Sequence, residues 1–174
     1  MPDGTLKILI IRLSSLGDIL LTTPVIRSLR RKYPDAEIDF LVRERYADTV
    51  RYNPHLSSVL MYEKTTGKQL RKSGYTHILD LQGNLRSKRI LSSVTAPVFR
   101  FRKHSFRKRL FVCTGINLLK KFPPIPDRYA AAFPLLQDND GKGLELFTGR
   151  ALPSQRDPKL IALCPGSRHF TKQW

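Results

Sequence analysis

Residues 7–32 join a short apolar strand to an amphipathic helix through a small polar turn, and this pairing limits the folds open to the chain. Residues 7–12 form an apolar, β-branched run without alternation, which is typical of a strand covered on both faces of a parallel sheet. Apolar residues at helical spacing follow over 18–32, and basic residues gather in the last turn. Strand, turn and helix in this order predict the first half of a βαβ unit.

The same alternation continues through the next hundred or so residues. The further strands that we expect are 37–42, 59–62, 76–81 and 97–101, and the further helices are 45–52, 68–72, 86–93 and 127–133. Regular alternation of this kind predicts an α/β fold with a Rossmann-like, doubly wound parallel sheet.

The sequence suggests one complete domain and the start of another. We expect residues 1–137 to form the Rossmann-like domain and residues 138–158, rich in Asp, Gly, Pro and Lys, to be an interdomain linker. Residues 159–174 have the pattern of one buried strand and a turn, which cannot bury their own apolar surface. They predict the first strand and turn of a second, truncated domain.

Targeting and redox features point to the cytoplasm. No stretch approaches the roughly 20 apolar residues of a membrane span, and acidic Asp3 precedes the first strand, so we expect no signal peptide. Cys113 and Cys164 lie far apart without metal-ligand spacing, which favours two reduced thiols over a disulfide or a metal site.

The turn after the first strand is the predicted functional site, because ligands of open α/β sheets bind at the carboxyl ends of the strands. It carries Ser14, Ser15, Gly17 and Asp18, without the full Gly-x-Gly-x-x-Gly spacing of dinucleotide-binding turns. Two roles are open for the carboxylate: it complements the positive end of the following helix, or it is a general base. The handedness of βαβ crossovers brings Asn84, after the fourth strand, to the same crevice.

The charge of the chain is strongly uneven. The formal net charge is +17, and residues 81–126 contain no acidic residue. The basic residues of this stretch are Arg86, Lys88, Arg89, Arg100, Arg102, Lys103, Arg107, Lys108, Arg109, Lys120 and Lys121. A merely solvated face usually mixes both signs, so the stretch favours an anionic partner: nucleic acid, a membrane surface or a phosphorylated substrate.

Nucleic-acid binding is an alternative that the composition leaves open. Phe99, Phe101 and Phe106 alternate with arginines and are of a type that stacks on bases. Their spacing is also that of core residues on a strand and a helix, and no nucleic-acid-binding motif is present. We therefore expect no nucleic-acid partner, and keep a basic binding module without catalysis as the second hypothesis.

Four separated motifs, in this order, resemble the bacterial lipopolysaccharide heptosyltransferases, of the ADP-heptose family of glycosyltransferases. The motifs are residues 13–18 followed by Thr23 and Pro24, residues 80–84, residues 127–129, and residues 165–174. The resemblance implies the N-terminal domain of a two-domain glycosyltransferase of the GT-B type. In such enzymes the N-terminal domain receives the acceptor and the C-terminal domain binds the nucleotide-sugar donor, so this chain looks truncated and inactive by itself.

The resemblance also assigns roles to residues. Asp18 matches the base that deprotonates the acceptor hydroxyl in an inverting transfer, and Ser167, Thr171 and Lys172 match donor-binding positions. It implies no metal and no cofactor other than the donor substrate, ADP-heptose.

The acceptors in that family are anionic inner-core lipopolysaccharides at the cytoplasmic face of the inner membrane. This implies peripheral contact with that membrane and gives the basic stretch a use, since guanidinium groups suit phosphate and carboxylate recognition. The acceptor-binding candidates are Ser14, Ser15, Gly17, Asn84, Arg100, Arg102, Lys103, Arg107 and Arg109.

Overall fold

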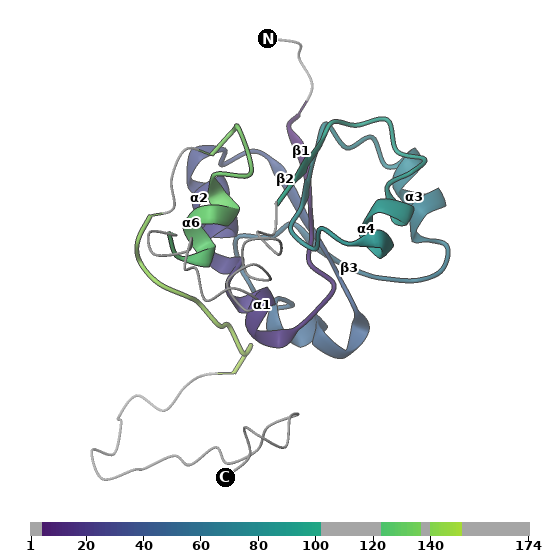
Figure 1. Ribbon diagram of the computed structural model, residues 1–174. Coiled ribbons are helices and arrows are strands. Elements are labelled where there is room, and N and C mark those ends of the chain that lie inside the picture. Colours follow the sequence, from purple (N-terminus) through teal and green to yellow (C-terminus); the bar gives the residue numbers. More distant parts are fainter. Residues whose placement is uncertain (1–4, 102–122, 137–139, 151–174) are drawn as a thin grey trace, which may run out of the picture.

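The computed structural model describes residues 5–101, 123–136 and 140–150 (Figure 1). Its elements, in chain order, are β1 (Lys7–Ile11), α1 (Leu16–Leu20), α2 (Thr23–Lys32), β2 (Glu37–Val42), the 3₁₀ helix η1 (Glu44–Thr49), β3 (Ser58–Met61), α3 (Thr66–Lys72), β4 (His77–Asp80), α4 (Leu85–Ile90), β5 (Val98–Arg100) and α6 (Ile125–Ala130).

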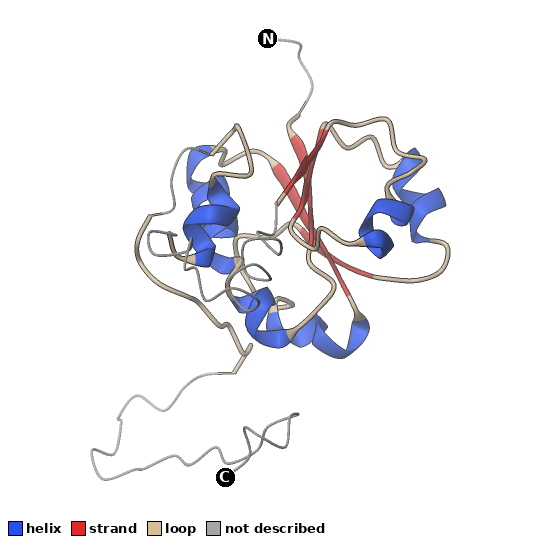
Figure 2. Cartoon of the chain, viewed as in Figure 1, coloured by secondary structure: helices blue, strands red, loops and turns tan. Residues whose placement is uncertain are grey.

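Five parallel strands form one sheet in the order β3-β2-β1-β4-β5, with β1 at its centre (Figure 2). The order reverses at β1, because the chain builds outward through β2 and β3 and then returns to the other side of β1 through β4. This is the doubly wound arrangement that the βα alternation predicts, and it confirms the α/β fold class. The second domain expected from residue 159 onward lies outside the described residues.

Both faces of the sheet are buried, which explains why the strand sequences do not alternate with polar residues. On β1, Ile8 and Ile10 pack into the core beneath α1, α2 and α6, while Leu9 and Ile11 pack into the core beneath α3 and α4. Figure 1 shows α2 and α6 on one side of the strands and α3 and α4 on the other.

The prediction of one continuous helix over 18–32 is wrong, because the structure has two helices there, α1 and α2. Pro24 has no N–H to donate to the carbonyl oxygen of Leu20, four residues earlier. The Thr23 hydroxyl donates to that oxygen instead, at 2.8 Å, and α2 starts afresh with Pro24 in its first turn. The expected helix over 45–52 is the shorter 3₁₀ helix η1.

Residues 140–150, within the predicted linker, lie against α2 through Arg27. The Arg27 side chain is buried and forms two hydrogen bonds with Asp140, Nε to Oδ2 at 2.6 Å and Nη2 to Oδ1. It also donates to the Gly143 carbonyl at 3.1 Å and pairs with Glu145 at 2.9 Å. The Asp140 hydrogen bond raises the pKa of Arg27, and Arg27 in turn holds the pKa of Asp140 below its ordinary value. We call this set the Arg27 network.

Among the described residues, the helices are all too short or too polar to cross a membrane.

Candidate functional site at the carboxyl edge of the sheet

The turns after β1 and β4 meet at the carboxyl edge of the sheet. Ile11 lies opposite Asp80 in the parallel pairing of the two strands. The side chain of Gln82 then crosses between the turns, and its Oε1 accepts hydrogen bonds from the N–H groups of Leu13 at 2.9 Å and Ser14 at 3.3 Å. The expectation that both strand ends share one edge is confirmed.

Asp80, which is fully buried, organises the second of these turns. Its Oδ1 accepts from the N–H of Gly83 at 2.9 Å, and its Oδ2 accepts from the Ser87 hydroxyl at 2.8 Å and from Nε of Arg100 at 3.3 Å. Gly83 has φ of +52°, and a Cβ there would come within 2.9 Å of the Phe101 carbonyl oxygen, so the turn requires glycine. Asp80 therefore holds the turn rather than facing a ligand.

Asp18 stands at the third position of α1, with one carboxylate oxygen fixed and the other open. Oδ2 pairs with Nη2 of Arg12 at 2.6 Å and accepts from the Ser15 hydroxyl at 3.0 Å and the Ser15 N–H at 3.3 Å. Within the described part of the chain, no hydrogen bond reaches Oδ1, and 40% of the side chain is exposed. The contacts of Oδ2 with Ser15 stabilise the start of α1, and Oδ1 is the oxygen that could act as a general base.

The environment of Asp18 favours the ionised carboxylate. Burial raises the pKa of Asp18, but the hydrogen bond and charge of Arg12, together with the Ser15 donors, lower it further, so the net pKa lies below the ordinary value. The group is thus an acceptor of protons at neutral pH, although a weak one. Proton transfer to it is favourable only once the donor has itself become strongly acidic.

Arg12 is a site residue that the sequence reasoning missed. It directly follows β1 with a side chain only 6% exposed, and its Nη1 donates to the Leu81 carbonyl at 2.5 Å while Nη2 pairs with Asp18. Its guanidinium also lies over the Tyr129 ring, 6.0 Å from the centroid. The sequence did contain a sign of this role: Arg12 is a cation at the end of an apolar strand, and a buried cation needs an anionic partner nearby.

Most of the predicted turn is exposed in the described part of the chain. Ser15, Leu16 and Gly17 are exposed, and a Cβ added to Gly17 would meet no atom within 4 Å. Ser14 is half-buried. Among the described residues, none packs against the position of Gly17, next to Asp18.

Asn84 has a structural task at the start of α4. Its Oδ1 accepts the Ser87 N–H at 3.0 Å, and its own N–H donates to the Ser87 hydroxyl at 3.2 Å, which is a capping arrangement. Arg100 is exposed at the end of β5 apart from its contact with Asp80. Contact of Asn84 and Arg100 with an acceptor stays a prediction.

The other candidates fall on residues that the structure does not describe. These are Arg102, Lys103, Arg107, Arg109, Ser167, Thr171 and Lys172.

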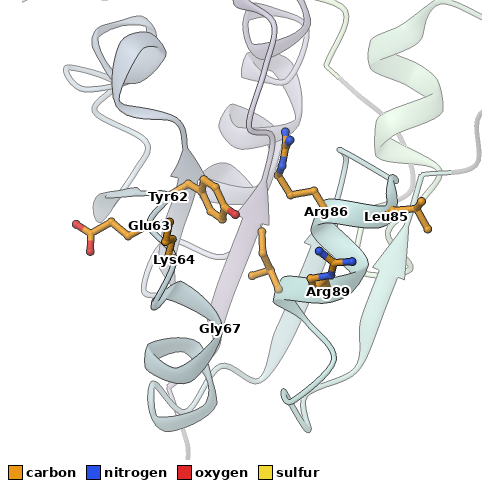
Figure 3. Close-up of a pocket in the computed structure, with 8 residues that line it drawn as sticks. Tyr62, Glu63, Lys64, Gly67, Leu85, Arg86 and Arg89 are labelled. Carbon is orange, nitrogen blue, oxygen red and sulfur yellow. The ribbon is translucent and has the colours of Figure 1, made fainter.

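A cavity of about 350 Å³ lies at the same edge, between the loop after β3 and α4 (Figure 3). Its lining residues are Tyr62, Glu63, Lys64, Gly67, Leu85, Arg86, Arg89 and Ile90. Three of them are cations and one is an acid. Figure 3 shows Tyr62 extending toward α4 and Glu63 pointing away from it. We call this the basic cavity. Arg86 and Arg89 belong to the acid-free stretch, whereas the contribution of Lys64 from another element was not predicted.

The aromatic residues that suggested nucleic-acid binding are core residues where the structure describes them. Phe101 is buried, with its ring 4.7 Å from that of Tyr129, and Phe99 packs against Phe133 at 5.3 Å. Rings in these positions are not free to stack on bases. Across the described ranges, no group of three or more His, Cys, Asp or Glu residues is arranged to hold a metal ion.

Replacing Arg12 by Met is expected to raise the pKa of Asp18, because the variant loses the cation that favours the ionised carboxylate. An NMR titration of the Asp18 carboxyl carbon measures this directly. Arg71→Met, at an exposed position on α3, is the control and should leave the titration unchanged. An Asp18 titration that stays the same in Arg12→Met would contradict the assignment of Arg12.

Comparison with known proteins finds similar sequences among the heptosyltransferases, although no family model matches the chain. The chain is 28% identical over 112 residues to lipopolysaccharide heptosyltransferase 1 of Campylobacter coli, covering 59% of this chain and 33% of that protein. It is 36% identical over 64 residues to lipopolysaccharide heptosyltransferase 3 of Escherichia coli, covering 36% and 19%. The matched part is thus a third or less of the length of these relatives.

Solved structures agree on the fold. A glycosyl transferase of family 9 from Veillonella parvula superposes with a TM-score of 0.63 at 21% identity, over 84% of this chain and 46% of that one. The E. coli ADP-heptose lipopolysaccharide heptosyltransferase II superposes with a TM-score of 0.57 at 22% identity, over 86% and 44%. The resemblance of this chain to the lipopolysaccharide heptosyltransferases is therefore confirmed for the part that these matches cover.

Proposed function

We propose that this chain is the acceptor-binding portion of a heptosyltransferase that transfers heptose from ADP-heptose to the inner core of lipopolysaccharide. Relatives named for that activity support the assignment. The observation that carries it is Asp18, whose carboxylate stands at the carboxyl edge of the sheet with Oδ2 held by Arg12 and Ser15 and with no hydrogen bond to Oδ1 from the described residues. The test is heptose transfer by this chain joined to the donor domain of a related heptosyltransferase.

In the proposed reaction, an acceptor hydroxyl lies against Oδ1 of Asp18. Its oxygen attacks the anomeric carbon of the donor, the bond from that carbon to the diphosphate breaks, and the configuration inverts. The hydroxyl proton passes to Asp18, and ADP leaves with the bonding electrons. Because the pKa of Asp18 is lowered, we infer a late proton transfer, after the attacking oxygen has lost much of its electron density. Ser167, Thr171 and Lys172 keep the donor-binding role that the resemblance implies, and no metal enters the proposal.

The basic cavity gives the acceptor a second point of contact. Lys64, Arg86 and Arg89 line it, and it shares the carboxyl edge of the sheet with the turn that carries Asp18. Inner-core acceptors are anionic, and guanidinium groups bind phosphate and carboxylate in a bidentate manner. Part of this positive charge is also suited to the anionic surface of the inner membrane, so we include peripheral contact with that membrane in the proposal.

The double variant Arg86→Gln, Arg89→Gln is expected to raise the KM for the acceptor about tenfold or more while changing kcat little, because it removes binding that ground and transition states share. Transfer assays at several acceptor concentrations, on the chain joined to a donor domain, separate the two constants. The double variant Arg71→Gln, Lys72→Gln on α3 removes the same charge away from the cavity and is the control. An equal increase in KM in both double variants would show that only the net charge of the chain matters and would contradict a specific role for the basic cavity.

Binding without turnover is the second candidate for the 174-residue chain itself. The resemblance places the adenine and ribose contacts in a second domain, so we expect calorimetry to find no appreciable binding of an ADP-sugar to residues 1–174. Micromolar binding of ADP-heptose to this chain would contradict that expectation.

A further inference from the structure

A second cavity, of about 520 Å³, lies on the α3 side of the sheet, over β2 and β3. Its lining residues are Lys7, Glu37, Asp39, Leu41, Ser58, Val59, Leu60, Met61, Glu63, Thr66, Gln69, Leu70, Ser73 and Tyr75. Most of them come from β2, β3 and α3, and neither Asp18 nor the arginines of the basic cavity are among them. Its size is within the range of small-molecule sites.

Asp39 is the unusual member of this lining. It sits in the middle of β2 with only 3% of its surface exposed. The Tyr75 hydroxyl donates to its Oδ2 at 2.7 Å, whereas its Oδ1 is buried without a hydrogen-bond partner among the described residues. Burial, together with the charge of Glu37, raises the pKa of Asp39, and the Tyr75 hydroxyl, the charge of Lys7 and the Ser58 hydroxyl oppose that rise in part. A buried carboxylate oxygen without a donor is rare in folded proteins, because its lost hydration is not replaced.

The charge of the cavity is opposite to that of the chain. Its ionisable lining comprises three acids, Glu37, Asp39 and Glu63, and one base, Lys7, apart from the Tyr75 hydroxyl. Lys7 pairs with Glu37 at 2.7 Å and its charge also acts on Asp39, so one base faces three acids in the cavity. In a chain with a formal net charge of +17, this is a locally acidic hollow.

We propose that this cavity binds a small organic cation, whose primary ammonium group donates a hydrogen bond to Oδ1 of Asp39 when the atoms that cover this oxygen move aside. An ammonium supplies three donors and a positive charge, and hydrogen bonds between ionised partners are the strong ones. Leu41, Leu60 and Leu70 form apolar walls that suit the alkyl part of such a ligand. The inference rests on Asp39 and its surroundings and is independent of the proposed transferase function.

Butylamine and butanol, which have the same carbon chain, provide the test on the intact 174-residue protein. Titration followed by the backbone amide signals in ¹⁵N NMR is expected to give saturable shifts with butylamine, centred on Ser58, Gln69 and Tyr75. Butanol is expected to bind at least about tenfold more weakly, because it lacks the charge. No saturable shift with butylamine, or equal affinity for butanol, would overturn the proposal.

Asp39→Asn tests the carboxylate itself. The amide has nearly the same size and can still accept the Tyr75 hydrogen bond, so the fold should persist, and the dispersion of the amide spectrum verifies that. Butylamine affinity is expected to fall about tenfold or more in this variant. Asp35→Asn, in the turn before β2 and outside the cavity, is the control and should bind like the parent protein. Undiminished butylamine binding by a folded Asp39→Asn protein would refute the role of Asp39, and the comparison with butanol remains decisive if that variant does not fold.

Discussion

Asp18→Asn is expected to slow heptose transfer by about 100-fold to 10,000-fold, the usual contribution of a general base. The amide keeps the size of the side chain and can still accept the Ser15 hydrogen bonds, but it cannot take up the acceptor proton. Turnover of the chain joined to a donor domain measures the loss. Donor affinity should stay nearly unchanged, because the resemblance assigns the donor to other residues.

Asp48→Asn separates this effect from a general loss of carboxylate charge. Asp48 is exposed on η1, and its contact is an exposed pair with Arg51 at 2.8 Å. Transfer by that variant should equal that of the parent. If Asp18 only started α1 and paired with Arg12, Asp18→Asn would lower the free energy of unfolding and leave turnover per folded molecule intact. Retained turnover would therefore contradict the assignment of the base.

Arg27→Met is expected to destabilise the fold by about 3–5 kcal/mol, because it removes the buried partner that makes the two shortest contacts with the Asp140 carboxylate. The loss should also release residues 140–150 from α2. Urea unfolding at neutral pH measures the free energy. The pKa of Asp140 is held below its ordinary value in the folded protein, so its stabilisation is present above that value and is lost as the pH falls. The difference in the free energy of unfolding between the parent protein and Arg27→Met should therefore become smaller as the pH falls.

Arg31→Met is the matched control for Arg27→Met. Arg31 also pairs with Asp140, at 3.3 Å, but its side chain is 60% exposed. Its removal should change the free energy of unfolding by at most about 1 kcal/mol. Equal destabilisation by the two variants would contradict the view that burial of Arg27 makes its pair important.

The positions of the strands follow from the sequence, because buried parallel strands read as continuous apolar runs. All five predicted strands are present within a residue or two of their expected ends. The break between α1 and α2 at Leu21 and Thr22 could not be predicted from periodicity, because the spacing of the apolar residues does not change there. Pro24 was the one local sign, because proline is favoured in the first turn of a helix and disfavoured inside one.

The candidate site was predictable only as far as local pattern reaches. The position of Asp18 after a buried strand made it predictable as a site residue. The role of Arg12 was not, because it depends on a side chain that contacts both Asp18 and the Leu81 carbonyl of another strand end. Lys64 and Arg86 line the basic cavity from two separate segments of the chain. The Arg27 network joins residues more than a hundred positions apart. Such contacts depend on how the elements pack, which periodicity alone does not specify.

Binding of the acceptor to this chain tests the central proposal most directly. The 174-residue protein is titrated with inner-core oligosaccharides that carry no heptose, one heptose or two heptoses, and the backbone amide signals locate the contact. We expect saturable shifts at Ser15 and Gly17 and at Arg86 and Arg89, weakened by salt as expected for an anionic ligand. An absence of saturable shifts, or shifts confined to other faces of the sheet, would contradict the assignment of this edge as the acceptor site.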